Sequence, residues 1–300
     1  QKVGGWFQEV YRGYRDADIA VVSAHAVWAL PLAWALAKRA KAPLVYNPHE
    51  LETRTPTMTG VKKTLAEQVE ARFIRRCQVV TAVNDEIADW YASQYRIARP
   101  LVVVNYPAAA TRGRPARDLR GELGLGGDEV LFVHTGHLTG GRNIPLILEE
   151  FAAGARHHVL FVGAGDMQSL VDEAAARSPF IHRMDPVPPD EVVSVVAGAD
   201  MSLSLIETLS QSYAWGSPNK LFEALAAGTP PVASDLPEAR RRLGSLAGDL
   251  VLSSPKDQLR GFLARLDRPM ALSFREHLTP LPTWEEGVEP LVEAYRALLG

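Results

Sequence analysis

The stretch SPNKLFEALAAGTPPVAS, residues 217–234, carries the signals of a helix, of its end and of a buried strand. Pro218 suits the first turn of a helix, where its missing N–H leaves no hydrogen bond unmade. Gly228 is the residue type that most often follows a helix in the left-handed conformation. The apolar residues 231–233 then predict a short strand. The stretch is therefore one helix–strand unit of an α/β protein.

The same alternation extends from this stretch back to residue 130. Uninterrupted apolar strands separated by helices are typical of parallel sheets, because helices cover both faces of such a sheet. Strands are predicted at 130–133, 158–162, 180–181, 201–206 and 231–233, and helices at 144–153, 168–177, 189–197 and 220–227.

An earlier α/β series precedes a segment, 107–128, that is rich in Arg, Gly and Pro and has the composition of a linker. Two Rossmann-like domains are therefore expected, with a ligand cleft between them at the carboxyl ends of the strands. The expected boundaries are 1–108, 109–282 and a C-terminal helical segment, 283–300. In the first domain, strands are predicted at 19–22, 43–46, 79–83 and 101–104, and helices at 27–40, 61–76 and 85–94.

The first domain is expected to be incomplete. Its pattern gives only about three good strands against five or six in the second, and so small a sheet would have exposed edges. Upstream residues or a separate chain would complete it, the alternative being a naturally minimal domain.

Composition excludes several classes of protein. A net charge of −3 over 300 residues lacks the clustered basic excess of a nucleic-acid binder. The single cysteine, Cys77, permits no internal disulfide. The longest apolar run, 26–37, is broken by Pro31 and is too short to span a bilayer, and no signal peptide opens the sequence. A cytoplasmic protein is expected.

The start of the helix near Pro218 is a candidate anion site, because it presents free N–H groups and a partial positive charge. Lys220 adds a full charge, and Glu223 follows one turn later. A cation beside diphosphate oxygens and a carboxylate that accepts two hydroxyl protons suit a nucleoside diphosphate. A plain surface ion pair is the alternative.

This stretch resembles the donor-site signature of the retaining glycosyltransferases of family 4, in the form P-N-K-x-x-E followed by A-x-G-x-P-x-V. The resemblance implies that Glu223 binds the ribose of a sugar nucleotide. It also implies that Pro218 and Asn219 belong to the donor site and that Lys220 lies near the diphosphate. The family more often has another Glu eight positions earlier, where this chain has Trp215. A carboxylate contact to the transferred sugar is therefore not expected from that position.

The segment GHLTGGRN, residues 136–143, is similar to the family's G-R-L-x-x-x-K-G segment, which grips the pyrophosphate. Arg142 stands at the Lys position and can bind phosphate as a fork. His137 replaces the Arg, which leaves a pH-dependent donor next to Gly136. Ordinary turn chemistry is the alternative interpretation of these glycines.

Two further turns match the family in position. Residues 163–166, Gly-Ala-Gly-Asp, are interpreted as a tight turn, because the full dinucleotide fingerprint is absent. Residues 183–187, which include Met184, stand where family members cradle the nucleobase through backbone atoms.

In the first domain, His49 ends a segment, 43–50, that resembles the family's strand-to-loop segment with a His at the cleft. The resemblance implies that His49 contacts the transferred sugar and aligns the reaction centre, and a capping or solvent-exposed His is the alternative. His25, which follows the preceding strand, is a second acceptor-side candidate.

Two surface features concern packing and partners. Apolar residues at helical spacing near 285–299 resemble the family's last helix, which crosses back onto the first domain, although a packing stripe also explains them. The segment 61–76 is basic and could contact an anionic membrane. Glu67 and Glu70 dilute its charge, so a solvated face and at most peripheral membrane contact are expected.

Together these features predict a GT-B glycosyltransferase that moves a sugar from a nucleotide sugar to a sugar, lipid-linked or small-molecule acceptor. His49, Arg142 and Lys220 are the expected catalytic residues, and retention of anomeric configuration is implied by the resemblance alone. No cofactor is expected, and no metal-ligand spacing occurs. A non-catalytic or partial sugar-nucleotide-binding subunit and a sugar-nucleotide epimerase on the same fold remain alternatives.

Overall fold

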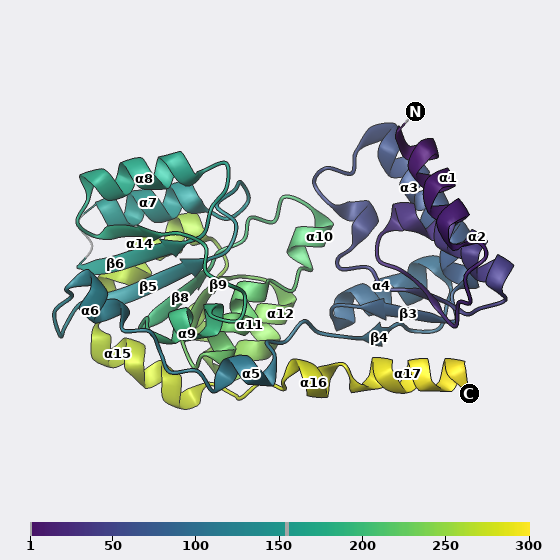
Figure 1. Ribbon diagram of the computed structural model, residues 1–300. Coiled ribbons are helices and arrows are strands. Elements are labelled where there is room, and N and C mark those ends of the chain that lie inside the picture. Colours follow the sequence, from purple (N-terminus) through teal and green to yellow (C-terminus); the bar gives the residue numbers. More distant parts are fainter. Residues whose placement is uncertain (1, 154–155) are drawn as a thin grey trace. The chain divides into compact units, whose positions relative to one another are not determined.

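The computed structural model describes residues 2–153 and 156–300 (Figure 1). Its contacts divide the chain into two compact units. Unit 1 comprises the chain up to residue 104 together with 210–216 and 287–300, and unit 2 comprises 105–209 and 217–286. The prediction treated 109–282 as one uninterrupted domain, whereas the contacts of 210–216 place that segment in unit 1.

Unit 1 is built on a parallel sheet of four strands in the order β1-β2-β3-β4, and each overlaps one of the four predicted segments, of which only about three counted as good strands. Helices follow the strands, as a parallel sheet requires. The helix α1 was not predicted, because glycines interrupt its apolar residues. The strands are β1 (Val22–Ala24), β2 (Leu44–Tyr46), β3 (Val79–Ala82) and β4 (Leu101–Val102), and the helices are α1 (Lys2–Tyr14), α2 (Leu30–Ala40), α3 (Gly60–Phe73), α4 (Asp85–Tyr95), α10 (Gln211–Ala214) and α17 (Glu289–Leu299).

A buried carboxylate, Glu70 of α3, organises the interior of unit 1. It is fully buried and accepts hydrogen bonds from the hydroxyls of Tyr46 (2.7 Å), Tyr91 (3.1 Å) and Tyr95 (2.6 Å). The Thr53 hydroxyl donates a fourth bond at 3.3 Å. Burial raises the pKa of Glu70, and the hydroxyl donors oppose that shift. Glu70 is therefore an interior residue, and the expectation that it dilutes the charge of a basic surface was wrong.

Unit 2 contains a parallel sheet of six strands in the order β10-β9-β8-β5-β6-β7. The chain leaves β5 toward β6 on one side and returns through β8 on the other. The carboxyl end of β5 is therefore the switch point at which α/β sheets bind ligands. The strands are β5 (Val130–Thr135), β6 (His157–Val162), β7 (Ile181–Met184), β8 (Met201–Ser204), β9 (Pro231–Ser234) and β10 (Val251–Leu252).

Helices cover both faces of this sheet, and Figure 1 shows α7 and α8 on one face and α9 and α11 on the other. The strands between them are almost wholly buried, which explains their uninterrupted apolar sequence. The helices of unit 2 are α5 (Ala109–Arg112), α6 (Leu119–Leu123), α7 (Ile144–Ala152), α8 (Gln168–Arg177), α9 (Val192–Ala197), α11 (Asn219–Ala226), α12 (Pro237–Leu243), α13 (Ala247–Leu250), α14 (Pro255–Arg265), α15 (Arg268–Ser273) and α16 (Trp284–Gly287, whose last residue falls in unit 1).

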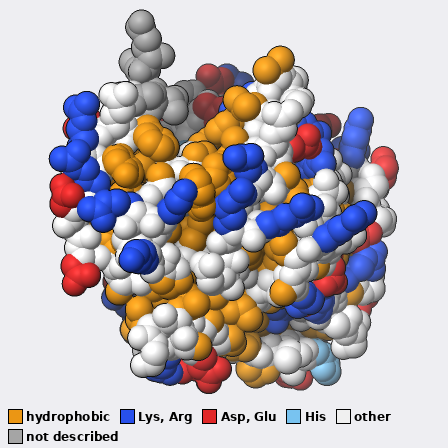
Figure 2. All heavy atoms as spheres, turned by 90° about the vertical axis from the view of Figure 1, so that its right-hand side faces the viewer, with side chains coloured by type: hydrophobic (Ala, Val, Ile, Leu, Met, Phe, Trp, Pro, Cys, Tyr) orange, Lys and Arg blue, Asp and Glu red, His pale blue; other side chains and the backbone are white. Residues whose placement is uncertain are grey.

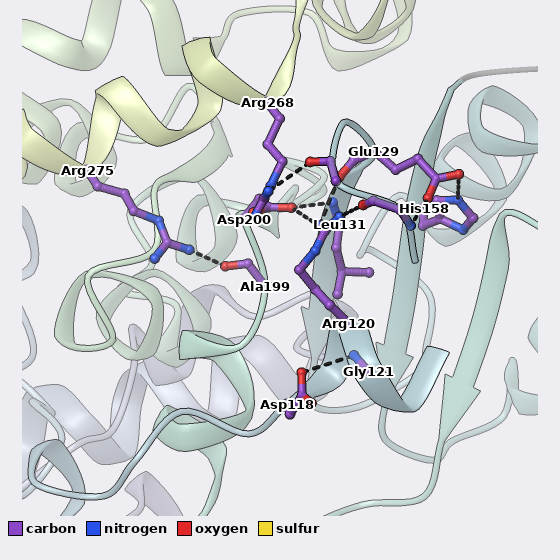
Figure 3. A network of polar contacts seen from close by, with 12 residues as sticks. Asp118, Arg120, Gly121, Glu129, Leu131, His158, Ala199, Asp200, Arg268 and Arg275 are labelled. Atoms are coloured by element: carbon purple, nitrogen blue, oxygen red, sulfur yellow. Dashed lines mark hydrogen bonds and ion pairs between the residues drawn. The ribbon is translucent and has the colours of Figure 1, made fainter. Parts of the chain in front are cut away.

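A second buried acid, Asp200, ties the amino-terminal edge of the unit 2 sheet together (Figure 3). Its carboxylate accepts from Arg120 at 2.8 Å, from the Leu131 amide at 2.9 Å and from Arg268 at 3.1 Å. These bonds join β5, the start of β8 and two outer helices at the edge opposite the switch point. Asp200 is therefore a structural residue.

Within the described part of the chain, no helix is both long enough and apolar enough to cross a membrane.

Replacing Glu70 tests its role in unit 1. We expect Glu70→Ala to destabilise the unit by at least about 3 kcal/mol, because several buried hydroxyls lose their acceptor at about 1–3 kcal/mol each. Glu70→Gln, which keeps one carbonyl oxygen as acceptor, should cost less. Chemical denaturation measures both, with the exposed Glu9→Ala of α1 as control. Equal stability of Glu70→Ala and the control would contradict the role assigned to Glu70.

Candidate functional site

The predicted donor residues of unit 2 gather at the carboxyl end of β5. The loop after β5 carries Gly136, His137 and Arg142, and α11 begins nearby with Asn219 and Lys220. This is the place at which the strand order predicts a ligand.

The ends of α11 confirm most of what the sequence indicated. Pro218 is the N-cap residue of the helix, one position before the first turn in which it was expected. At the other end, the Gly228 amide donates to the Leu225 carbonyl and the Thr229 amide to the Ala224 carbonyl. Gly228 has a φ of 66°, as a glycine at this kind of helix end requires.

Lys220 is buried at the start of α11, and its ammonium group contacts a histidine. Its Nζ lies 3.0 Å from Nε2 of His134 in β5. His134 is fully buried, and its other ring nitrogen, Nδ1, has no hydrogen-bond partner. A buried cation with a neutral imidazole as its partner is costly unless an anion is bound.

The electrostatics of this group follow from burial. Burial, and then the charge of Arg142, lower the pKa of Lys220 to about 7, and Glu223 acts in the opposite direction. Burial, Lys220 and Arg142 together hold the pKa of His134 well below its usual value. His134 is therefore neutral, and the group as a whole is deficient in negative charge.

Glu223 does not form the surface ion pair that was the alternative for it. Its Oε2 accepts from the Thr135 hydroxyl at 3.0 Å, and burial raises the pKa of the carboxyl, opposed by that bond and by Lys220. The half-buried carboxylate of Glu223 in α11 thus lies at the end of β5, with its second oxygen atom as a further acceptor.

The loop after β5 is fixed by a neighbouring turn and by an acid. The Gly136 amide donates to the Val162 carbonyl, and the Leu138 amide to that of Ala164. Glu207 accepts from the Asn143 amide at 3.3 Å, and its own amide donates to the Gly141 carbonyl. Glu207 therefore supports the loop that carries Arg142.

A pocket of about 350 Å³ opens beside this loop. His137 is exposed and lines it, and most of the remaining lining is apolar. The backbone carbonyl of Met184, at the end of β7, already accepts from the Gly163 amide at 3.2 Å. The apolar side of the pocket comprises Val162, Ala164, Pro186, Val187 and Val192.

In unit 1, the two predicted histidines lie together after adjacent strands. His25 Nδ1 is 3.3 Å from His49 Nε2, and the rings stack with centroids 5.4 Å apart. The Ser23 hydroxyl lies 3.2 Å from His25 Nε2. Burial, and then the neighbouring His49, lower the pKa of His25. The loop carrying His49 lies between Tyr46 and Thr53, both of which bond to Glu70.

The segment with Trp215 packs within unit 1. The Trp215 side chain is half-buried against the unit 1 core, and its carbonyl accepts from the Asn84 side chain at 2.6 Å. The Ser212 hydroxyl donates to Glu50 at 2.8 Å, one residue from His49. At the position where the family more often has a Glu, this chain therefore has a packing residue.

Figure 2 shows a face of the molecule on which Lys and Arg side chains lie among apolar ones. In unit 1, Glu67 is paired with Arg54 at 2.7 Å, and Glu70 is buried. The expected dilution of the exposed basic charge by these two acids is therefore not seen. Exposed basic side chains of α2, α3 and the turn after α3 are Lys38, Arg39, Lys62, Arg72, Arg75 and Arg76.

Three residues of the site were missed in the sequence. His134 and Thr135 lie inside an apolar strand, and Glu207 lies in a loop. The available signal for the first two was the presence of polar residues at the carboxyl end of a buried strand. No group of three His, Cys, Asp or Glu side chains that could hold a metal occurs among residues 2–153 and 156–300.

Comparisons with known proteins identify the families that the chain resembles. The model of the family described as Glycosyltransferase Family 4 matches residues 3–109, and the model of Glycosyl transferases group 1 matches residues 129–268. No curated protein sequence matches the chain.

Solved structures of glycosyltransferases share the fold. Anabaena HepE in complex with UDP-glucose is 14% identical, with a TM-score of 0.72 over 99% of this chain and 82% of that chain. Sucrose-phosphate synthase from Thermosynechococcus elongatus is 16% identical, with a TM-score of 0.72 over 99% and 78%. The pneumococcal O-GlcNAc transferase GtfA in complex with UDP and GlcNAc is 15% identical, with a TM-score of 0.62 over 99% and 60%.

The contact between the turns that follow β5 and β6 can be tested with one methyl group. A Cβ at Gly163, whose φ is 155°, would lie 1.9 Å from the Gly136 carbonyl oxygen. We expect Gly163→Ala to displace the 136–143 loop and to destabilise unit 2 by about 3 kcal/mol, at the upper end of overpacking costs. Gly140→Ala in the same loop meets no atom within 4 Å and is the matched control. Thermal denaturation of both variants measures the difference, and equal midpoints would contradict the tight contact.

Proposed function

Since the chain belongs to the glycosyltransferases of family 4 and group 1, we propose that it transfers a sugar from a nucleotide sugar to an acceptor hydroxyl. One observation supports the donor class most directly. Lys220 is buried at the start of α11, with Arg142 acting on its charge and no carboxylate as its hydrogen-bond partner. Such a group is built to receive an anion.

The diphosphate would bind at the start of α11. Its oxygens would accept from the Lys220 ammonium, from Arg142 and from amides at the helix start, where the helix dipole adds positive potential. The same donors would stabilise the charge that grows on the leaving diphosphate as the bond to the sugar breaks. This chemistry needs no covalent intermediate on Lys220 or Arg142.

The nucleoside would extend along the carboxyl end of the unit 2 sheet. Glu223 has one oxygen bonded to Thr135 and could accept from the ribose hydroxyls, while the pocket beside His137 would take the base. Anabaena HepE is described in complex with UDP-glucose, and a uridine nucleotide is therefore the first donor to test.

The acceptor would contact unit 1 near His49 and His25. The hydrogen-bonded pair can present a ring nitrogen to a sugar hydroxyl, which would align the reacting carbon. We propose retention of anomeric configuration, as the family signature implies. The acceptor class (sugar, lipid-linked or small molecule), peripheral membrane contact and cytoplasmic location stay predictions.

A non-catalytic sugar-nucleotide-binding subunit is the second candidate. The packing of Trp215 in unit 1 favours it, because a carboxylate that the family more often provides is replaced by an apolar side chain. A sugar-nucleotide epimerase on the same fold is the third candidate. It would process the donor without an acceptor.

Titration with nucleoside diphosphates and sugar nucleotides tests the donor site. We expect one base to stabilise the protein selectively, by about 2.7 kcal/mol at a hundredfold its dissociation constant. Glu223→Ala should weaken binding about tenfold to a hundredfold, because hydrogen bonds to a charged group contribute about 1.5–3 kcal/mol. The exposed Glu149→Ala of α7 is the control. No shift with any nucleotide would refute the proposed function.

Kinetics of His49→Ala test the role of unit 1. We expect donor affinity to stay within about threefold and kcat to fall about a hundredfold, as the loss of a group that orients the reacting atoms predicts. The measurement is sugar transfer to an acceptor panel alongside direct titration of the donor. A loss of donor affinity equal to the loss of rate would argue against an orienting role. Donor binding without transfer to any acceptor would favour the non-catalytic candidate.

A further inference from the structure

His134 is the partner of Lys220 and has no role assigned by the family signature. Its Nε2 is 3.0 Å from Lys220 Nζ, and both side chains are buried. Because Nδ1 has no partner, no other hydrogen bond selects the tautomer of the ring. The imidazole can therefore donate a hydrogen bond from Nε2–H to a neutral amine, or accept one at Nε2 from an ammonium group. Either state of Lys220 keeps its hydrogen bond.

We propose that the His134–Lys220 pair couples binding of the donor diphosphate to the uptake of one proton by Lys220, with His134 as the positioning residue. The inference rests on the proposed function and concerns the same site. In the free protein above neutral pH, His134 donates from Nε2 to the neutral amine. When the diphosphate binds, the amine takes a proton from solvent. The ammonium then donates to phosphate and to His134, whose remaining proton moves to Nδ1.

The charged and titratable groups around Lys220 set the sign of the effect. Arg142, from the loop after β5, disfavours a second positive charge, and Glu223, from its own helix, favours one. Burial and Arg142 hold the free lysine at a pKa of about 7, and a bound diphosphate raises it. Uptake therefore occurs above pH 7 and disappears below it, where Lys220 is already charged.

Affinity follows the same linkage. Above neutrality, binding should weaken by up to about tenfold for each pH unit, because each unit makes the required proton scarcer. Below neutrality, the lysine contributes no pH dependence. Glu223, whose pKa burial raises, acts on the acid side, where its protonation would remove a ribose acceptor.

Calorimetry with UDP-glucose as the probe tests the coupling. Its diphosphate is esterified at both ends and keeps its charge across the neutral range, so the diphosphate itself neither takes up nor releases a proton. Titrations in buffers of different ionisation enthalpy should give close to one proton taken up at about pH 8.5 and close to none at about pH 5.5. His277→Asn, which removes an exposed imidazole outside the site, should leave the uptake unchanged.

Variants separate coupling from packing. Lys220→Met should abolish the uptake. His134→Leu should shift the pH at which affinity begins to fall to a lower value, because the buried ammonium loses its hydrogen-bond acceptor. His134→Gln, whose amide can donate and accept, should restore it. A purely structural His134 would change the melting temperature and leave that pH unmoved.

The outcomes distinguish this inference from the function on which it rests. UDP-glucose binding without proton uptake at about pH 8.5 would overturn the coupling and leave the donor site intact. Failure of UDP-glucose and of every other sugar nucleotide to bind would overturn both. The measurement on the unmodified chain decides the matter even where a buried variant fails to fold.

Discussion

The contact between Lys220 and His134 is the interaction on which the candidate site depends. It joins the end of β5 to the start of α11, two segments that the chain brings together only because β5 and β8 are neighbours in the sheet. A lysine in this position costs free energy in the absence of an anion. The sheet around it is buried on both faces, so unit 2 can carry that cost and keep the site formed.

The buried acid of unit 1, Glu70, differs from Lys220 in that the protein itself satisfies its hydrogen bonds. Glu70 receives four hydroxyl donors from the protein itself, including Tyr46 and Thr53 at either side of the loop that holds His49. A satisfied polar cluster of this kind fixes geometry and has no remaining need for a ligand. In unit 1, Glu70 has its hydrogen bonds satisfied and positions a loop. In unit 2, Lys220 lacks a carboxylate partner and can bind an anionic substrate group.

Periodicity was sufficient to predict most strands and helices, because buried parallel strands are uninterrupted in sequence and glycines mark the helix ends. Arg142, Lys220 and Glu223 were predicted because they lie in local motifs of loops and helix starts. His134 and Glu207 could not be found in this way, since their roles arise from contacts with residues far along the chain. Glu70 looked like part of a surface because helical spacing alone does not say which side of α3 faces the interior. The placement of 210–216 in unit 1 likewise depends on tertiary contacts from Asn84 and Glu50.

The boundary between the units falls inside the donor signature. Trp215 belongs to unit 1 and packs on its core, and Ser217 begins the part of the signature that belongs to unit 2. A carboxylate at position 215 would sit against apolar side chains and would need another partner to offset its desolvation. The Trp215 side chain packs there without such a partner, and the backbone carbonyl of this residue accepts from the Asn84 side chain. The groups proposed to bind diphosphate and ribose, Arg142, Lys220 and Glu223, all lie in unit 2, so this exchange leaves them in place.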